Sequence, residues 1–260
     1  MAAMENEAAL ATTTAQEGGL HISLAAEKLG SFFGLPITNT LVMGWFITLV
    51  IVVLVFFYRR KVALVPGRLQ VVFESMIEFV YDYVSHTLES KDLARRFFPL
   101  IMSIFLFVLA ANLIQFLPGV GSIGFYENGE LVPMFRSLNT DLNMTLALAI
   151  IAVITVQISG VVALGVLKYG AKFITLKSPM AFALGVIDLI SEITRIISFS
   201  FRLFGNILAG EIMLAIAAFF LPYVLPVPLM LFEVFVAFVQ AGVFAMLTLF
   251  FIKIAIMEPH

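Results

Sequence analysis

The chain has 260 residues and a formal net charge of −2, and it is 62% hydrophobic with only 12% charged side chains. A soluble domain carries about a quarter charged residues, so water is not the main solvent of this chain. The near-neutral charge without a basic block gives no sign of a nucleic-acid partner. The chain contains no cysteine, which excludes disulfides, thiol nucleophiles and thiolate metal sites.

The N-terminal segment lacks the features of a cleaved targeting signal. Glutamates and small residues fill it, and no basic region leads into an apolar core, so it is not a secretory signal peptide. We expect residues 1–37 to form a tail on the outer, periplasmic side of the membrane. Residues 38–260 are then expected to form a single membrane domain.

Apolar runs dominate the rest of the chain. A helix needs roughly 20 apolar residues to cross about 30 Å of hydrocarbon, and five runs meet this length. Between the first two runs, residues 68–90 place apolar side chains on one helical face and acidic ones on the other, which predicts an amphipathic helix on the membrane surface. The predicted fold class is therefore an all-α integral membrane protein with five membrane-crossing helices and one amphipathic interfacial helix. The five runs lie near 38–58, 97–117, 142–167, 179–220 and 228–252.

The fourth run is too long for an upright helix. A continuous helix over 179–220 would extend about 60 Å, twice the thickness of the hydrocarbon. The run is either steeply tilted or broken near Gly205 into two spans. Steep tilt is favoured, because two spans would move Lys253 to the side that carries few basic residues. We therefore expect the fourth and fifth spans to be long and tilted.

Basic residues predict the orientation, since Lys and Arg accumulate in short cytoplasmic loops. With five spans and the N-terminus outside, most of the 15 basic residues fall on the cytoplasmic side. Only Lys28 and Arg136 fall outside, while Arg195 and Arg202 lie within the fourth run. The C-terminus is then cytoplasmic.

Arg202 is the most unusual residue of the chain. It lies near the middle of the run between Pro179 and Pro222, so it is near the bilayer midplane at any tilt. An arginine there costs roughly 2.5–3.5 kcal/mol on insertion scales, so it needs a partner or a function. A guanidinium keeps its proton in proteins, which makes Arg202 a fixed positive charge rather than a proton carrier.

Other polar residues share the helical face of Arg202 and form a polar stripe. This pattern predicts that this face of the helix contacts water or polar partners rather than lipid. One alternative is an ion pair within the helix, Arg195 with Asp188 or Glu192, which leaves Arg202 without a carboxylate. On the last run, Gln240 shares the depth of Arg202, and it is as readily a packing residue as a transport residue. The stripe contains Asp188, Glu192, Arg195, Arg202 and Asn206, with Ser191 and Ser198 at its edge.

Depth divides the carboxylates into two groups. Glu211 and Glu233 lie between the midplane and the outer surface, whereas Asp188 and Glu192 lie toward the inner surface. No acid of the chain shares the depth of Arg202, so a relay through this chain alone would stop at a positive barrier. A mobile carboxylate of a partner, held ionised by Arg202, would complete a path made of two halves.

Four segments of the chain resemble subunit a of the F-type ATP synthase. They are FRLFGNILAGE at 201–211, VAFVQAGVFAMLTLFFI at 236–252, RRFFPLIMSIFLFVLAANLIQFLPG at 95–119 and TDLNMTLALA at 140–149. The resemblance implies a non-catalytic, proton-translocating stator subunit in a bacterial inner membrane. Its implied partners are a rotating ring of c subunits, the b subunits of the peripheral stalk and other ATP synthase subunits, with no cofactor and no metal.

Carried onto this sequence, the resemblance makes Arg202 the essential gate that faces the ring carboxylate and prevents proton leak. Some members of the family carry histidine where this chain has Glu211 and Glu233, so the outer half-channel is expected to depend on a carboxylate pair. A proton-coupled secondary transporter is the alternative, but no internal repeat is visible. Depth and resemblance together assign Glu211, Glu233, Asn206, Gln240, Asp141 and Asn143 to the outer half of the path, and Asp188, Ser191, Glu192 and Arg195 to the inner half.

Overall fold

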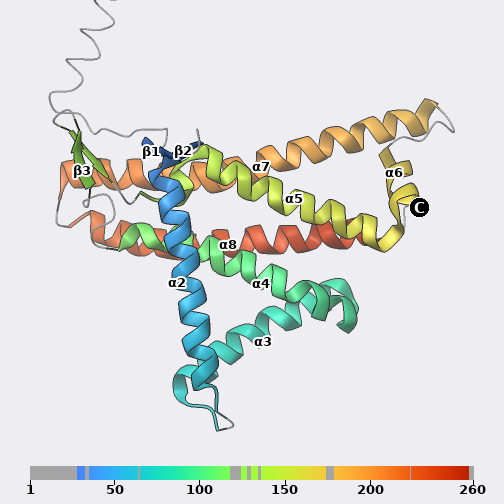
Figure 1. Ribbon diagram of the computed structural model, residues 1–260, viewed down its shortest axis with the longest axis horizontal. Helices are drawn as coiled ribbons and strands as arrows, with labels where there is room; N and C mark the ends of the chain where they lie inside the picture. The colour runs from blue at the N-terminus through green and yellow to red at the C-terminus, as the bar shows by residue number, and fades with distance from the viewer. Residues whose placement is uncertain are drawn as a thin grey trace, which may run out of the picture.

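The helices of the computed structural model lie at the positions expected from the apolar runs (Figure 1). Among the described residues, five helices are long and apolar enough to cross a membrane, which confirms the predicted fold class. They are α2 (Asn39–Lys61), α4 (Lys91–Leu113), α5 (Leu142–Leu164), α7 (Pro179–Phe220) and α8 (Pro226–Ile256). The structure describes residues 28–32, 35–63, 65–117, 124–127, 130–133, 136–173, 179–222 and 224–257.

Two further helices connect the spans on one side of the molecule. The predicted amphipathic helix is α3 (Arg68–Leu88), which packs on α4 with the Tyr81 and Phe98 ring centroids 5.4 Å apart. A short helix that was not predicted, α6 (Val166–Phe173), follows α5 directly.

Two short antiparallel hairpins and two 3-10 turns were also not predicted. Strands β1 (Lys28–Phe32) and β2 (Leu35–Thr38) precede α2, and β3 (Gly124–Glu127) and β4 (Glu130–Pro133) follow the 3-10 turn η1 (Ile114–Phe116). A second 3-10 turn, η2 (Leu138–Thr140), leads into α5. Residues 1–27 of the predicted tail lie outside the described part of the chain, and its last residues form the first hairpin.

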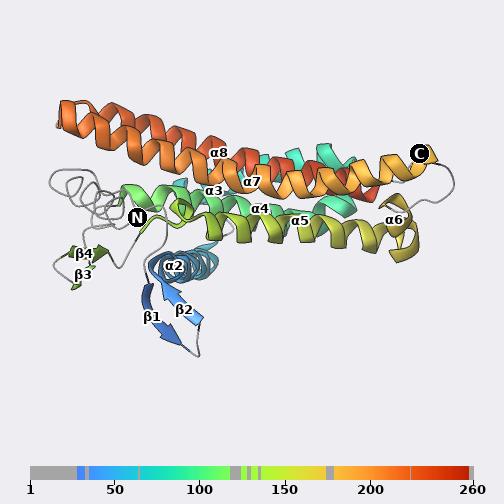
Figure 2. The same cartoon turned by 90° about the horizontal axis from the view of Figure 1, so that it is seen from above.

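Helix α7 is unbroken over 42 residues and passes through Gly205 without interruption, so the alternative of two separate spans is wrong. It runs beside α8 in both ribbon views, while α2 crosses both helices steeply (Figures 1 and 2). Helices at such an angle cannot all stand along one membrane normal. The tilt of α7 and α8 against the bilayer remains a prediction, and this crossing favours it.

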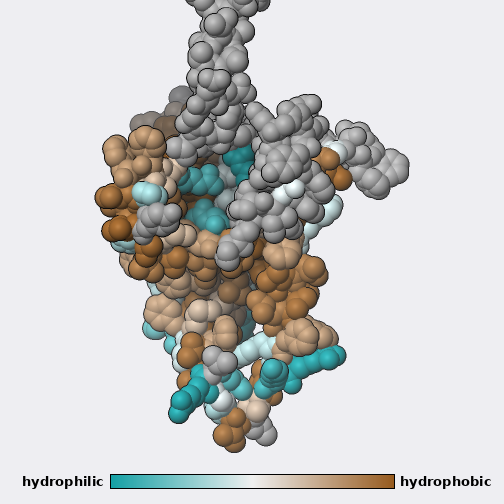
Figure 3. Space-filling view, turned by 90° about the vertical axis from the view of Figure 1, so that its left-hand side faces the viewer, coloured by the Kyte–Doolittle hydropathy of each residue, from teal (hydrophilic) through white to brown (hydrophobic). Residues whose placement is uncertain are grey.

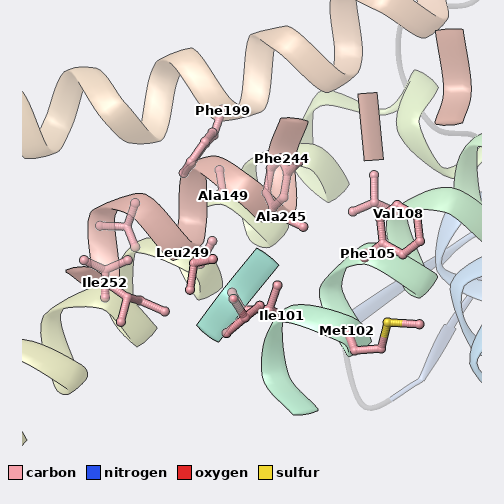
Figure 4. Close-up of a cluster of buried hydrophobic side chains, with 14 of the residues drawn as sticks. Ile101, Met102, Phe105, Val108, Ala149, Phe199, Phe244, Ala245, Leu249 and Ile252 are labelled. Atoms are coloured by element: carbon pink, nitrogen blue, oxygen red, sulfur yellow. The ribbon is translucent and has the colours of Figure 1, made fainter. Parts of the chain in front are cut away.

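Small residues allow the central helices to approach one another closely, as is usual in membrane bundles. Ala149 on α5 and Ala245 on α8 are almost fully buried in this core (Figure 4). On α7, the ring of Phe199 packs on that of Phe244 of α8, with centroids 4.8 Å apart. Because Phe199 lies one turn before Arg202, this contact fixes the height of the arginine against α8.

The outer surface reflects a lipid environment. Large apolar side chains are exposed along α2, α5, α7 and α8. Figure 3 shows the end at which α8 begins, where hydrophilic residues gather in a hollow above an apolar surface. A second hydrophilic group lies at the opposite edge of this face, where α2 ends.

Helices α5 and α6 pack tightly against each other. Gly160 lies against the ring of Tyr169, so that a Cβ on this glycine would overlap the ring. The hydroxyl of Tyr169 donates a hydrogen bond to Oε1 of Gln157 at 2.5 Å. Tyr169 is buried by these contacts, which hold α6 on the end of α5.

We predict that Gly160→Ala destabilises the protein by about 1–3 kcal/mol, the usual cost of overpacking, since the Tyr169 ring must move. Gly170→Ala is the matched control, because its Cβ would meet open space. Thermal unfolding of the purified complex measures both variants. Equal melting temperatures for the two would contradict the contact as described.

Candidate functional site

Arg202 lies on α7 without an ionic partner among the described residues. Its Nη2 donates a long hydrogen bond of 3.5 Å to Oγ of Ser198, one turn earlier. Its Nη1 is buried and has no acceptor in the part of the chain described. A buried charged donor left unpaired is costly, so an acceptor from outside this chain is expected here.

A groove of about 420 Å³ runs from Arg202 along α7 and α8. It brings together two cationic side chains, Arg195 and Arg202, and three hydroxyl groups, and no carboxylate of the described residues lines it. Its lining residues are Ile187, Ile190, Ser191, Thr194, Arg195, Ser198, Phe199, Arg202, Leu247 and Phe251. The groove therefore holds the Arg202 charge at one end and polar groups along its wall.

Arg195 is held on two sides. Its Nη1 lies 2.8 Å from both carboxylate oxygens of Glu192, and its guanidinium carbon lies 3.8 Å from the centroid of the Phe251 ring on α8. This confirms the alternative of an ion pair within the helix, with Glu192 as the partner rather than Asp188. Asp188 is half-buried on the same helix and forms no ion pair within the described residues.

On the other side of Arg202, α7 and α8 bring Glu211 and Glu233 together. Glu233 is only 8% exposed, and its carboxylate lies so close to Gly210 that a Cβ on this glycine would overlap it. The two carboxylates interact electrostatically, and Glu211 also interacts with Arg136. Oε1 of Glu233 and Nε2 of Gln240 are buried without a partner among the described residues, so this region holds unsatisfied polar atoms.

A buried amide chain adjoins these carboxylates, and sequence reasoning missed it. Nδ2 of Asn139 donates to Oδ1 of Asn112 at 2.6 Å, and Nδ2 of Asn112 donates to the carbonyl of Ala237 on α8 at 3.3 Å. Oδ1 of Asn139 and Oγ of Ser137 are buried without a partner in the described structure. Such atoms are normally served by water. An asparagine inside an apolar run was the available signal.

Asp141 and Asn143 have clear structural roles. Asp141 caps α5: its Oδ1 accepts hydrogen bonds from N and Nδ2 of Asn143, at 2.9 and 3.1 Å. Its Oδ2 accepts from Oγ1 of Thr40 on α2 at 3.0 Å. The residue thus fastens the start of α2 to the start of α5. Its place on an outer path remains a prediction.

The structure therefore divides the predicted residues into two polar groups. Glu211 and Glu233 lie between α7 and α8 on one side of Arg202, together with the amide chain, and Gln240 lies two turns further along α8 than Glu233. Ser191 and Arg195 line the groove on the other side. Asn206 lies one turn beyond Arg202 and is half-buried.

Comparison with known protein families matches residues 41–253 to the ATP synthase A chain family. The chain belongs to this family. ATP synthase subunit a of Moorella thermoacetica is 33% identical over 218 residues, which cover 84% of this chain and 90% of that protein. Subunit a of Campylobacter jejuni is 33% identical over 205 residues, covering 78% and 83%, and that of Sulfurihydrogenibium sp. is 32% identical over 212 residues, covering 81% and 94%.

Family membership confirms the resemblance seen in the sequence. The chain is a multi-pass membrane protein and the non-catalytic proton-channel subunit of an ATP synthase. Its partners are other ATP synthase subunits.

If Glu233 lies on the proton path, we predict that Gly210→Ala lowers ATP-driven proton pumping by about tenfold or more, since displacing a functional group by about 1 Å can cost up to a hundredfold. The added methyl group would push the Glu233 carboxylate from its place. Adding Glu233→Asp, which shortens that side chain, should restore part of the rate. Quenching of a pH-sensitive dye in inverted vesicles measures pumping. An unchanged rate in Gly210→Ala would contradict the prediction that pumping requires the Glu233 carboxylate at this position.

Proposed function

We propose that this chain forms two offset half-channels that meet at Arg202, against a rotating ring of c subunits. The observation that carries the proposal is the guanidinium of Arg202, which lies between two polar groups without an ionic partner among the described residues. A ring carboxylate supplies the missing acceptor. The guanidinium holds that carboxylate ionised while the two are in contact.

Arg202 also separates the half-channels. It cannot pass on a proton, because a guanidinium is not deprotonated in proteins. Its fixed charge repels a proton that approaches from either side. A proton therefore crosses only when a ring carboxylate takes it up in one half-channel and releases it in the other.

The outer half-channel runs past the amide chain of Asn112 and Asn139 to Glu211 and Glu233. Buried polar atoms without partners in the described structure support a wet path here. Asp141 and Asn143 lie at its entrance, and Asn206 and Gln240 lead toward the arginine. The inner half-channel follows the groove with Ser191 and Arg195 on its wall and Asp188 and Glu192 beside it.

The proposed setting is the bacterial inner membrane, with the N-terminus outside and the C-terminus in the cytoplasm. The distribution of basic residues supports this orientation. Helices α2 and α3 are the expected contact region for the b subunits of the peripheral stalk, because much of α2 is exposed and apolar.

Arg202→Ala tests the gate. We predict a loss of ATP-driven pumping by at least about a hundredfold in inverted vesicles, since removing a preorganised charge typically costs 10² to 10³ in rate. Passive proton leak should rise once the soluble head is removed, because the barrier between the half-channels is gone. Arg68→Ala, at the start of α3, is the control. Undiminished coupled pumping in an assembled Arg202→Ala complex would overturn the proposal.

Glu233→Gln tests the carboxylate pair. Because Glu211 and Glu233 interact electrostatically, neutralising one changes the protonation of the other. We expect the pumping rate to fall and its dependence on outer-side pH to change shape. Measurement of the rate across pH in assembled complexes gives the answer. A pH profile identical to that of the unmodified protein would contradict the proposal that Glu211 and Glu233 act as a coupled pair.

A further inference from the structure

The groove contains two arginines, but the structure treats their charges differently. Arg195 and Arg202 are seven residues apart on α7, about 10 Å along one face of the helix. Arg202 has no carboxylate among the described residues, whereas Arg195 has both oxygens of Glu192 at 2.8 Å. Side-chain exposure is low for both members of this pair, 17% for Arg195 and 13% for Glu192.

Aromatic side chains keep the pair in place. The Phe251 ring of α8 covers the guanidinium of Arg195, with 3.8 Å between its carbon and the ring centroid. Tyr169 of α6 is close enough to interact electrostatically with both members of the pair. Burial first, and then the charge of Glu192, raise the pKa of Tyr169, so the phenol stays neutral. The pair is therefore a preorganised dipole rather than a mobile surface contact.

We propose that the Glu192–Arg195 pair sets the proton affinity of the inner half of the path by cancelling the second positive charge of the groove. This inference rests on the proposed function. Because Glu192 neutralises the charge of Arg195, only Arg202 holds a partner carboxylate ionised. The carboxylate is then attracted only at the depth of Arg202. An unbalanced Arg195 would extend that attraction about 10 Å inward, while a lone Glu192 would favour protonation there.

Several other charged or titratable groups lie on the helices that pack around the pair. Among the described side chains, α7 contributes Asp188 and Arg202 near the pair, α6 contributes Lys168 and Tyr169, and α5 has no titratable residue. On α8, Nζ of Lys253 binds Oε1 of Glu89 at 2.7 Å. Lys253 lowers the pKa of this exposed Glu89 carboxyl, chiefly through the hydrogen bond. The two acid–base pairs differ in exposure, which provides a matched control.

Substitutions of Glu192 and of Arg195 should shift the pH midpoint of proton conductance in opposite directions. Glu192→Gln leaves an excess positive charge, so the pH midpoint of proton conductance on the inner side should fall. Arg195→Gln leaves an excess negative charge, so the midpoint should rise. Each shift is expected to be about one pH unit, the size that Coulomb's law gives for a charge about 10 Å away at an effective dielectric constant of about 20.

The assay uses inverted vesicles that contain the whole membrane sector after removal of the soluble head, because their external pH is the inner-side pH. Passive proton conductance is recorded as that pH is varied. The double variant Glu192→Gln with Arg195→Gln and the conservative variant Arg195→Lys should both return the midpoint toward its original value. Glu89→Gln, which breaks the exposed pair, should leave it unchanged.

The positive charge at position 195 can also be restored chemically after the complex has assembled. This separates the effect of the charge from any effect of the substitution on folding. The chain has no cysteine, so Arg195→Cys provides a single thiol in this chain. A cationic thiol reagent should restore the midpoint, and a neutral reagent of similar size should not. Equal effects of the two reagents, no shift, or shifts of the same sign in both single variants would overturn the role of the pair. Absence of proton conductance in the unmodified complex would instead overturn the proposed function.

Discussion

A guanidinium group halfway along a membrane helix is the constraint on which the rest of this structure depends. Hydrocarbon tolerates such a charge only if polar groups or a partner stabilise it. The chain places Ser198 and an aromatic ring beside Arg202 but gives it no carboxylate among the described residues. In the proposed function, a carboxylate of another subunit supplies the stabilising charge.

Close packing of α7 on α8 converts this charge into a defined site. Phe199 against Phe244 fixes the height of Arg202, and Gly210 makes room for the carboxylate of Glu233. Each contact depends on a residue of suitable size rather than on a polar interaction. The apolar core therefore determines how far the acidic groups lie from the arginine.

The apolar runs predicted the five long helices, because hydrocarbon requires about 20 consecutive apolar residues whatever the tertiary contacts. Helical periodicity placed Glu192 and Arg195 together, and the i+3 pair was correctly foreseen as an alternative. The contact of Glu233 with Gly210 and the chain from Asn139 through Asn112 to Ala237 were not predictable. They join residues far apart in sequence, and their geometry depends on how α4, α7, α8 and the turn η2 pack together. The hairpins were missed because their strands are only four or five residues long.

The continuity of α7 has a mechanical consequence. Glu192 and Glu211 lie on one hydrogen-bonded helix on opposite sides of Arg202, about 28 Å apart at 1.5 Å per residue. A helix without a break cannot bend sharply between them, since sharp kinks need a proline, a bulge or an inserted group. Neither half can then be displaced without the other. The two carboxylates are therefore held at a fixed separation along α7, and any force that displaces this helix as a whole moves both of them together.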